Sequence, residues 1–352
     1  MKTSIFVLIT LIELTVAFPR FSQAAVPPGD EFSAETISVT IQKAQLLHSN
    51  GQYYKVIQTL HAHGVDTADS RASSLVGMSF SAINDYENAF YFLRRACTTD
   101  STNISYWFQL AMFSSQCGLI QDAEKDYKTI IALDSTFLPA FIRLGIIYYD
   151  QKLFDQAKAC FSYVVACNPR DYLADYYMGT LLATSSEKDS AMTFLKNCIQ
   201  LNNGFVRALD VLASLYYAQK DYINALQLYQ KASQFRPTTA DYLYKIGLCN
   251  RQLKEYDTAI VYLKNAAAID TTNAGYFTQL AYCSYFMEQY NSSIDYSLKA
   301  ISFDDENYTY YTNLALSYQK LDSVDRLIGV YRKIIDLHHP DDIASLYFQI
   351  AM

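Results

Sequence analysis

The sequence has no cluster of lysine and arginine. Its 28 Lys and Arg residues are outnumbered by 35 Asp and Glu residues, which leaves a net charge of −7. Proteins that bind nucleic acids normally carry a basic patch that neutralises phosphates, so this composition argues against a nucleic-acid partner. Glycine is scarce as well, at 11 residues, and no glycine-rich phosphate loop is present. We therefore expect no bound cofactor of the nucleotide type.

Residues that could form a catalytic or metal centre are few and scattered. The five histidines lie near opposite ends of the chain, as His48, His61, His63, His338 and His339. Their spacing matches no known metal-ligand motif, and no nucleophile or pair of acids converges on one segment. We expect no catalytic residues, no metal and no cofactor, and therefore no enzymatic activity.

The seven cysteines lack the even number and regular spacing of a disulfide framework. Most of them fall on the faces of predicted helices. We expect free, buried thiols, with Cys198 acting as a small core residue.

No apolar run is long enough to span a membrane as a helix. The run from Ile5 to Ala17 is short and is followed by small residues near Ala24, which is the layout of a secretory signal. We predict a signal peptide over residues 1–24 and a linker with paired prolines over residues 25–36. The expected product is exported, to a bacterial periplasm, without stable membrane insertion. An apolar N-terminal tail is the alternative.

A 34-residue period is the strongest feature that the sequence does have, and it runs from about residue 70 to 341. The twentieth position of each repeat is usually alanine, and the eighth is always glycine or alanine: Gly77, Ala111, Gly145, Gly179, Ala213, Gly247, Ala281 and Ala315. Small side chains allow two helices to approach to about 8–10 Å. The period therefore predicts a solenoid of stacked helices.

Residues 206–239 illustrate how one repeat is built. The spacing i, i+3, i+4, i+7 places four residues on one face of each of two helices: Leu209, Leu212, Ala213 and Tyr216, then Tyr222, Ala225, Tyr229 and Ala232. The polar turn between them has three residues, so the two helices must be antiparallel. Each helix alone is marginal in water, and stacking is expected to stabilise it.

This pattern resembles the tetratricopeptide repeat family, whose repeats favour Leu-Gly at positions 7 and 8, Ala at 20 and an aromatic at 24. The repeat over residues 138–171 matches with Phe141, Leu144, Gly145, Tyr148, Ala157, Phe161 and Pro169. The resemblance covers about residues 37–341, or nine copies, the first of them one residue out of phase. It implies an all-α fold, a right-handed superhelical solenoid of antiparallel helix pairs. Ser297 and Leu327 depart from the pattern.

Residues 342–352 follow the array and place Ile343, Leu346 and Ile350 on one helical face. We predict a C-terminal capping helix that covers the last repeat. The alternative is the first helix of an interrupted repeat.

The resemblance also implies where a partner binds. In this family, positions 2, 5, 6, 9, 12 and 13 of each first helix line a concave groove, and here they are rich in tyrosine and arginine. These two residue types contribute strongly to binding energy at interfaces. The candidate residues are Phe108, Arg143, Tyr149, Tyr176, Tyr177, Arg207, Tyr217, Tyr244, Arg251, Tyr282 and Tyr285.

We therefore expect an exported, non-catalytic scaffold that binds a protein or extended peptide through this Tyr-rich groove. The clamp of paired Lys, Asn and Arg by which some family members hold a peptide C-terminus is absent. The alternative is a glycan-binding module, in which tyrosines stack on sugar rings and Asp150, Asp210 and Asp241 contact hydroxyls. A hidden enzyme is a third, disfavoured interpretation.

Overall fold

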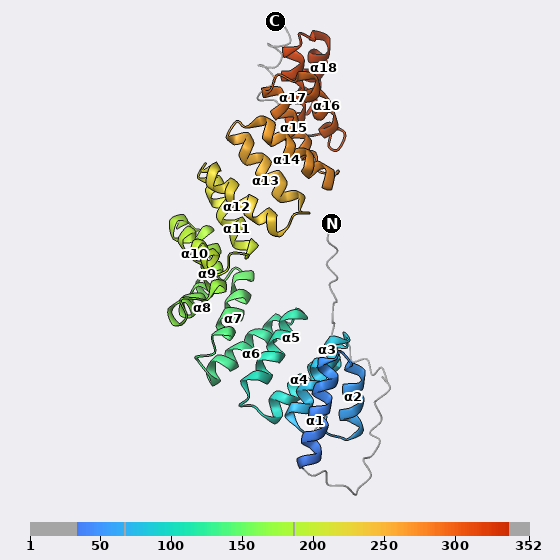
Figure 1. Cartoon of the computed structure of the whole chain (residues 1–352), viewed down its shortest axis with the longest axis vertical. Coiled ribbons are helices and arrows are strands. Elements are labelled where there is room, and N and C mark those ends of the chain that lie inside the picture. The colour runs from blue at the N-terminus through green and yellow to red at the C-terminus, as the bar shows by residue number, and fades with distance from the viewer. Residues whose placement is uncertain (1–33, 67, 186, 338–352) are drawn as a thin grey trace. The chain divides into compact units, whose positions relative to one another are not determined.

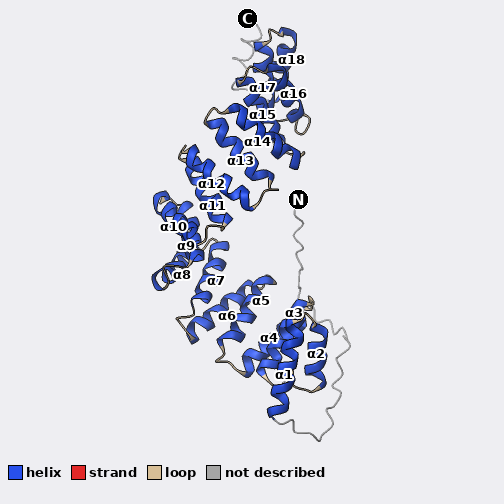
Figure 2. Cartoon of the chain, viewed as in Figure 1, coloured by secondary structure: helices blue, strands red, loops and turns tan. Residues whose placement is uncertain are grey.

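The computed structural model describes residues 34–66, 68–185 and 187–337, and across these ranges the chain forms α-helices and no strand (Figures 1 and 2). The helices are α1 (Ala34–Ser49), α2 (Tyr53–Ala62), α3 (Ser70–Ala82), α4 (Tyr86–Thr99), α5 (Ile104–Gln116), α6 (Ile120–Leu133), α7 (Leu138–Asp150), α8 (Phe154–Cys167), α9 (Tyr172–Ala183), α10 (Lys188–Leu201), α11 (Val206–Ala218), α12 (Tyr222–Phe235), α13 (Ala240–Gln252), α14 (Tyr256–Ile269), α15 (Ala274–Phe286), α16 (Tyr290–Ile301), α17 (Tyr308–Lys320) and α18 (Val324–Leu337).

Some of the predicted segments lie outside the described residues. These are the signal peptide over 1–24, most of the linker over 25–36 and the capping helix over 342–352. Helix α1 begins at Ala34, slightly before the expected start of the repeat array at residue 37.

The chain divides into two compact units, residues 1–140 and 141–352, and each is described by itself. Within each unit, helices that follow one another along the chain pack side by side, as α3 does with α4 and α11 with α12. First helices of neighbouring repeats also touch, such as α1 and α3 in the first unit and α9 and α11 in the second. The predicted all-α solenoid of antiparallel helix pairs is confirmed.

Among the described residues, the tight turn inside eight of the helix pairs has a residue of unusual backbone conformation at an equivalent position. Its backbone is left-handed, with φ between 51° and 78°, at Gly51, Asn84, Gly118, Lys152, Lys220, Lys254, Glu288 and Asp322. This conformation closes the first helix. In the repeat that begins at residue 206, the Lys220 N–H donates to the Tyr217 carbonyl over 3.0 Å and the Asp221 N–H to the Tyr216 carbonyl over 2.9 Å. The turn is thus bonded to the last turn of the first helix.

The glycines at the eighth position lie where two helices approach most closely. A Cβ atom on Gly77, Gly145, Gly179 or Gly247 would lie 2.7–2.8 Å from a side-chain carbon of the residue sixteen positions later. Those residues are Leu93, Phe161, Leu195 and Leu263, all nearly or fully buried. Alanines at the twentieth position are fully buried too, Ala225 among them. The predicted role of the small residues in helix packing is confirmed.

Ser297, which departs from the family pattern, lies in a small buried polar cluster of the second unit. The Ser317 hydroxyl donates to Ser293 Oγ over 2.8 Å, and the Ser293 hydroxyl donates to the Ala281 carbonyl over 2.8 Å. Ser297 Oγ is buried and has no hydrogen-bond partner among the described residues. Other copies have a larger residue at the position of Ser297. The small serine therefore makes the interior of this repeat more polar than that of its neighbours.

All seven cysteines are free thiols, as expected. Five are buried, and burial raises the pKa of four of these thiols to about 12: Cys97, Cys198, Cys249 and Cys283. These four are protonated at neutral pH and unreactive as nucleophiles. The expectation of burial is wrong for Cys117 and Cys167, which are exposed because they lie at the C-terminal ends of their helices.

Asp126 is a buried carboxyl in the first unit, 3% exposed, and its Oδ2 atom has no hydrogen-bond partner among the described residues. Burial raises its pKa from 3.8 to about 6, although the Arg94 guanidinium partly lowers it. Between about pH 4 and pH 6, the Asp126 carboxyl is therefore mainly protonated in the folded chain and mainly ionised in the unfolded chain. Folding stability falls as the pH rises through this window.

We expect Asp126→Asn to remove this pH-dependent loss of stability. At pH 7.5 the variant should be more stable than the natural protein by roughly 1–3 kcal/mol, because no buried carboxylate has to ionise. At pH 4 the two should be similar. Urea unfolding at both pH values measures the difference in stability between the variant and the natural protein. A difference that does not change with pH would contradict the raised pKa of Asp126. Asp295→Asn, on the exposed side of α16, is the control.

Candidate functional site

The first-helix face consists of positions 2, 5, 6, 9, 12 and 13 of the first helix in each repeat. The structure places all eleven candidate residues on this face, and none of them is buried. Phe108 belongs to α5 in the first unit. In the second unit the others are Arg143 and Tyr149 on α7, Tyr176 and Tyr177 on α9, Arg207 and Tyr217 on α11, Tyr244 and Arg251 on α13, and Tyr282 and Tyr285 on α15.

An aromatic cluster surrounds Tyr177 in the second unit. The Tyr177 ring lies flat on Phe161, with ring centroids 5.1 Å apart and an interplanar angle of 8°. The rings of Tyr149 and Tyr176 meet it edge-on at 6.0 and 5.0 Å, and Phe205 continues the cluster 5.0 Å from Tyr176. Sequence reasoning included the three tyrosines but left out Phe161 and Phe205, which lie outside the positions that it considered.

Tyr176 and Tyr177 remain neutral phenols at physiological pH. Burial raises the pKa of both Tyr176 and Tyr177, and the Arg207 guanidinium opposes this rise in each case. Neither hydroxyl has a hydrogen bond to any residue in the described part of the chain. Each is therefore available as a donor and acceptor for a bound molecule.

Two arginines lie close enough to this cluster to act on its hydroxyl groups. Arg143 on α7 and Arg207 on α11 are both exposed. Neither makes an ion pair or hydrogen bond to the residues that the structure describes. Both guanidinium groups act on the Tyr177 hydroxyl and favour its ionised form, although burial outweighs them. Their charges thus lie near the cluster.

The cations further along the face are already engaged. Lys245 forms ion pairs with Asp210 at 2.7 Å and Asp241 at 2.9 Å, and it lies over the rings of Tyr229 and Tyr242. The ion pair with Asp210 joins α11 to α13. Although burial opposes protonation, the two carboxylates raise the pKa of Lys245 above its usual value, so it is charged at neutral pH. It acts as a structural link between repeats.

Arg251 is engaged in a similar way. Its Nη1 donates to Gln279 Oε1 over 2.6 Å, and its guanidinium lies 5.0 Å from the centre of the Tyr282 ring. These contacts join α13 to α15. The next residue, Gln252, donates to the Tyr217 hydroxyl over 3.2 Å. The candidate residues Arg251, Tyr282 and Tyr217 thus connect neighbouring repeats, because the partner of each comes from the adjacent first helix.

The remaining tyrosines of the second unit pack against other rings. Tyr244 lies 5.1 Å from Tyr276, and Tyr285 lies 5.6 Å from Tyr290. Phe286 stacks on Tyr256 at 5.3 Å. Such contacts fix the orientation of the rings and leave only part of each exposed.

In the first unit, Phe108 lines a pocket of about 390 Å³ on the same face. Met78 of α3 and Met112 of α5 contribute flexible apolar walls. His48, at the end of α1, lines it too; its Nε2 atom is buried without a partner among the described residues, and burial lowers its pKa. The hollow can accept one apolar side chain.

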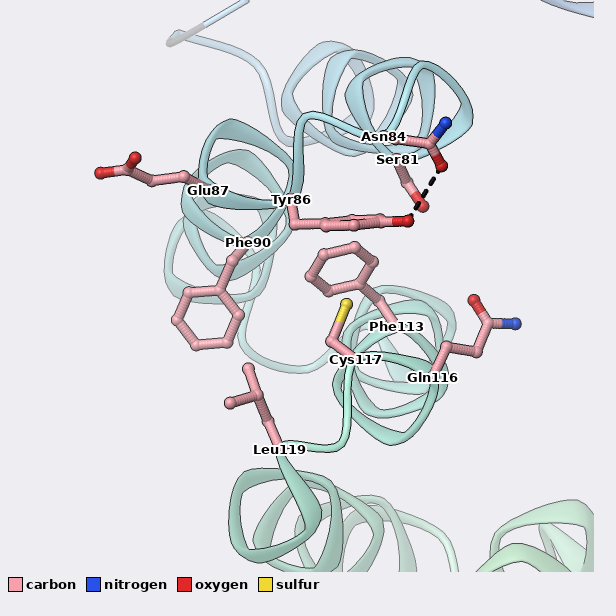
Figure 3. A pocket seen from close by; sticks show the side chains of 9 residues that line it. All are labelled: Ser81, Asn84, Tyr86, Glu87, Phe90, Phe113, Gln116, Cys117 and Leu119. Atoms are coloured by element: carbon pink, nitrogen blue, oxygen red, sulfur yellow. Dashed lines mark hydrogen bonds between the residues drawn. The ribbon is translucent and has the colours of Figure 1, made fainter. Parts of the chain in front are cut away.

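A larger pocket of about 960 Å³ in the first unit was not anticipated from the sequence (Figure 3). It lies between the turn after α3 and the turn after α5, with Tyr86, Phe90 and Phe113 as its aromatic walls. The Tyr86 hydroxyl donates to Asn84 Oδ1 over 2.9 Å, as the dashed line shows. The repeat pattern does not identify this pocket because turn residues, which vary between copies, form much of it.

Within the described ranges, no group of three or more His, Cys, Asp or Glu side chains could hold a metal ion. His61 instead meets the buried Asp66, with Nδ1 and Oδ2 2.8 Å apart. None of the helices that the structure describes is both long and apolar enough to cross a bilayer.

Comparisons with known proteins agree with the repeat pattern. A family model described as tetratricopeptide repeat matches residues 211–274, from α11 to the start of α15. The TPR repeat-containing protein YpiA of Bacillus subtilis (strain 168) is 18% identical over 214 residues, which is 60% of this chain and 50% of YpiA. The chain thus spans about half the length of this relative.

Solved structures include similar helical arrays. The crystal structure of YrrB, described as a TPR protein with an unusual peptide-binding site, has 18% identity and a TM-score of 0.47. The alignment covers 54% of this chain and 97% of YrrB. The pilF protein of Pseudomonas aeruginosa has 19% identity and a TM-score of 0.49, over 61% of this chain and 97% of the other.

Residues 211–274 match the tetratricopeptide repeat model, and the 34-residue period and the small residues at the contacts between antiparallel helices continue the same pattern in the other copies. Together these findings support a protein of the tetratricopeptide repeat family.

Proposed function

We propose that the chain is a non-catalytic scaffold whose first-helix face binds a protein or an extended peptide. The observation that carries this proposal is the cluster of Tyr149, Tyr176 and Tyr177, which is exposed in part. The hydroxyls of Tyr176 and Tyr177 lack hydrogen bonds to the described residues. Rings that are held in place by other rings lose little conformational entropy on binding, so their contacts contribute efficiently to affinity.

Two contacts favour a peptide over a glycan as the ligand. Of the three carboxylates expected to contact sugar hydroxyls, Asp210 and Asp241 are engaged by Lys245. One face of the Tyr177 ring is covered by Phe161, which reduces the flat surface on which a sugar could stack. A peptide can instead use ring edges, hydroxyls and guanidinium groups.

We also propose that the protein is exported to a periplasm. This part rests on the secretory pattern of residues 1–24 alone, which lie outside the described residues. The binding experiment below tests location and face together.

A pull-down with the chain from residue 25 onward is expected to recover a partner that the double variant Tyr176→Ala/Tyr177→Ala does not retain. The matched control is Tyr54→Ala/Tyr91→Ala, which removes two tyrosines that are 68% and 52% exposed on second helices. Circular dichroism verifies that each variant remains folded.

Periplasmic and cytosolic extracts are offered separately to the three proteins. Equal recovery of the partner by the Tyr176/Tyr177 variant and by the natural protein would rule out the first-helix face. Recovery from the cytosolic extract alone would contradict export but leave the binding face intact.

A further inference from the structure

The four cations on the first-helix face of the second unit that were considered above fall into two groups. Lys245 is held by Asp210 of the neighbouring repeat and by Asp241 of its own helix, and Arg251 is held by Gln279 and Tyr282 of the neighbouring repeat. Arg143 and Arg207 are exposed and have no such partner among the described residues. Lys245 and Arg251 therefore contribute to the fold. The guanidinium groups of Arg143 and Arg207 make no hydrogen bond to the described residues.

Two arginines without a partner among the described residues are unexpected in an acidic protein. The whole chain has a net charge of −7, so acidic groups were available to neutralise them. The charged groups near the Tyr177 cluster are Arg143, Arg207, Asp150 and Asp210. Asp210 already binds Lys245, which leaves two guanidinium groups against one free carboxylate. This part of the face is therefore locally positive.

The floor between these arginines is aromatic. Tyr149, Tyr176, Tyr177 and Phe205 form a continuous set of ring contacts, with centroids 5.0–6.0 Å apart. Apolar rings exclude water and lower the effective dielectric constant, so a charge pair formed beside them is stronger than one in bulk water. A guanidinium group binds a carboxylate with two parallel hydrogen bonds, which adds geometric selectivity.

We infer that the α7–α9–α11 part of the first-helix face recognises an acidic segment of a polypeptide, with carboxylates bound by Arg143 and Arg207 and neighbouring apolar or aromatic side chains packed on Tyr176 and Tyr177. This inference rests on the proposed function and specifies the chemistry of the partner. In the α11–α13–α15 part, by contrast, Lys245 and Arg251 are already engaged, so the electrostatic contacts with a ligand are assigned to the α7–α9–α11 part. Charge complementarity selects the acidic ligand, and the ring floor selects one with apolar residues as well.

The test uses a fluorescein-labelled peptide made of three Glu-Tyr-Glu-Ala repeats, and the same peptide with Gln in place of every Glu. Fluorescence polarisation measures the affinity of each for the chain. We expect the natural protein to bind the Glu peptide at least about tenfold more tightly than the Gln peptide. Raising the NaCl concentration should weaken the binding of the Glu peptide only, because salt screens exposed charges.

The protein variants are Arg143→Gln/Arg207→Gln and, as a control, Arg170→Gln/Arg236→Gln. Both double variants remove two exposed positive charges from the second unit. The control pair lies beyond the C-terminal ends of α8 and α12 and is not among the charges that act on Tyr176 and Tyr177. We expect the first variant to lose the preference for the Glu peptide and the control to keep it within about twofold. Equal effects of the two variants, or equal affinity for the two peptides, would overturn the inference.

Two further outcomes separate this inference from the function on which it rests. If the Arg143/Arg207 variant still captures the partner that the Tyr176/Tyr177 variant loses, the binding face stands and the acidic ligand is wrong. If a fluorescein-labelled single-stranded oligonucleotide with the same number of charges binds more tightly than the Glu peptide, the ligand is a polyanion of another class, and the inference is overturned as well.

Discussion

Replacing Phe161 with alanine is expected to lower the free energy of unfolding of the second unit by about 3–5 kcal/mol, the usual cost of removing a large buried aromatic side chain. Phe161 is fully buried in α8. It packs against the backbone of Gly145 on α7, and it supports the ring of Tyr177 on α9. The variant should therefore loosen three consecutive helices and disturb the proposed binding face at the same time.

Urea unfolding followed by circular dichroism measures the overall loss for Phe161→Ala. Hydrogen exchange is needed beside it, because a repeat array can open locally without unfolding as a whole. We expect protection to fall first in α7, α8 and α9. Phe235→Ala is the control, since Phe235 is 49% exposed and should cost no more than about 1 kcal/mol. Similar losses in both variants would show that Phe161 does not occupy the contact assigned to it.

Changing Gly179 to alanine is expected to destabilise the second unit, whereas changing Gly329 to alanine should stabilise it. Both residues are helical, and alanine is favoured over glycine in a helix by about 1 kcal/mol. At Gly329 nothing lies within 4 Å of the added Cβ, so this gain is kept. At Gly179 the Cβ would lie 2.7 Å from Leu195 Cγ and 3.2 Å from the Ala191 carbonyl oxygen. Overpacking of this kind costs about 1–3 kcal/mol and should outweigh the gain.

Thermal and urea unfolding of the two glycine variants tests whether the two substitutions change the stability in opposite directions. The contact itself is tested by combining Gly179→Ala with Leu195→Ala. Once the Leu195 side chain is removed, the alanine at position 179 should become neutral or stabilising, which gives a coupling energy between the two sites. If Gly179→Ala stabilises the protein to the same degree as Gly329→Ala, the close approach of α9 and α10 at this point is wrong.

Most of the fold could be predicted because the relevant interactions are short in sequence. The repeat over residues 206–239 was expected to contain two helices separated by a polar turn at Gln219 to Asp221, and α11 and α12 have these limits. Helical periodicity, turn length and small residues at contacts are all properties of segments shorter than one repeat. The left-handed backbone at Lys220 was not anticipated, because lysine has no special preference for that conformation.

The candidate site was predicted only as a face. Accessibility follows from helix geometry, and all eleven residues are indeed unburied. Helix geometry does not show which of these residues are free to bind a ligand. Arg207 and Arg251 are the same residue type on the same face, but Gln279, which binds Arg251, lies 28 residues further along the chain. Periodicity within one repeat carries no information about such a pair.

The amino-acid sequence by itself determined the architecture of this protein and the face that its first helices leave unburied, because the 34-residue period recurs in every copy and is set by local spacing. Only the tertiary structure decided how that face divides. Contacts between neighbouring first helices engage Lys245 through Asp210 and Arg251 through Gln279, whereas Arg143 and Arg207 have no such partner among the described residues. The physical reason is that ion pairs and ring contacts depend on the distances between side chains from different repeats, and these distances exist only after the helices have packed.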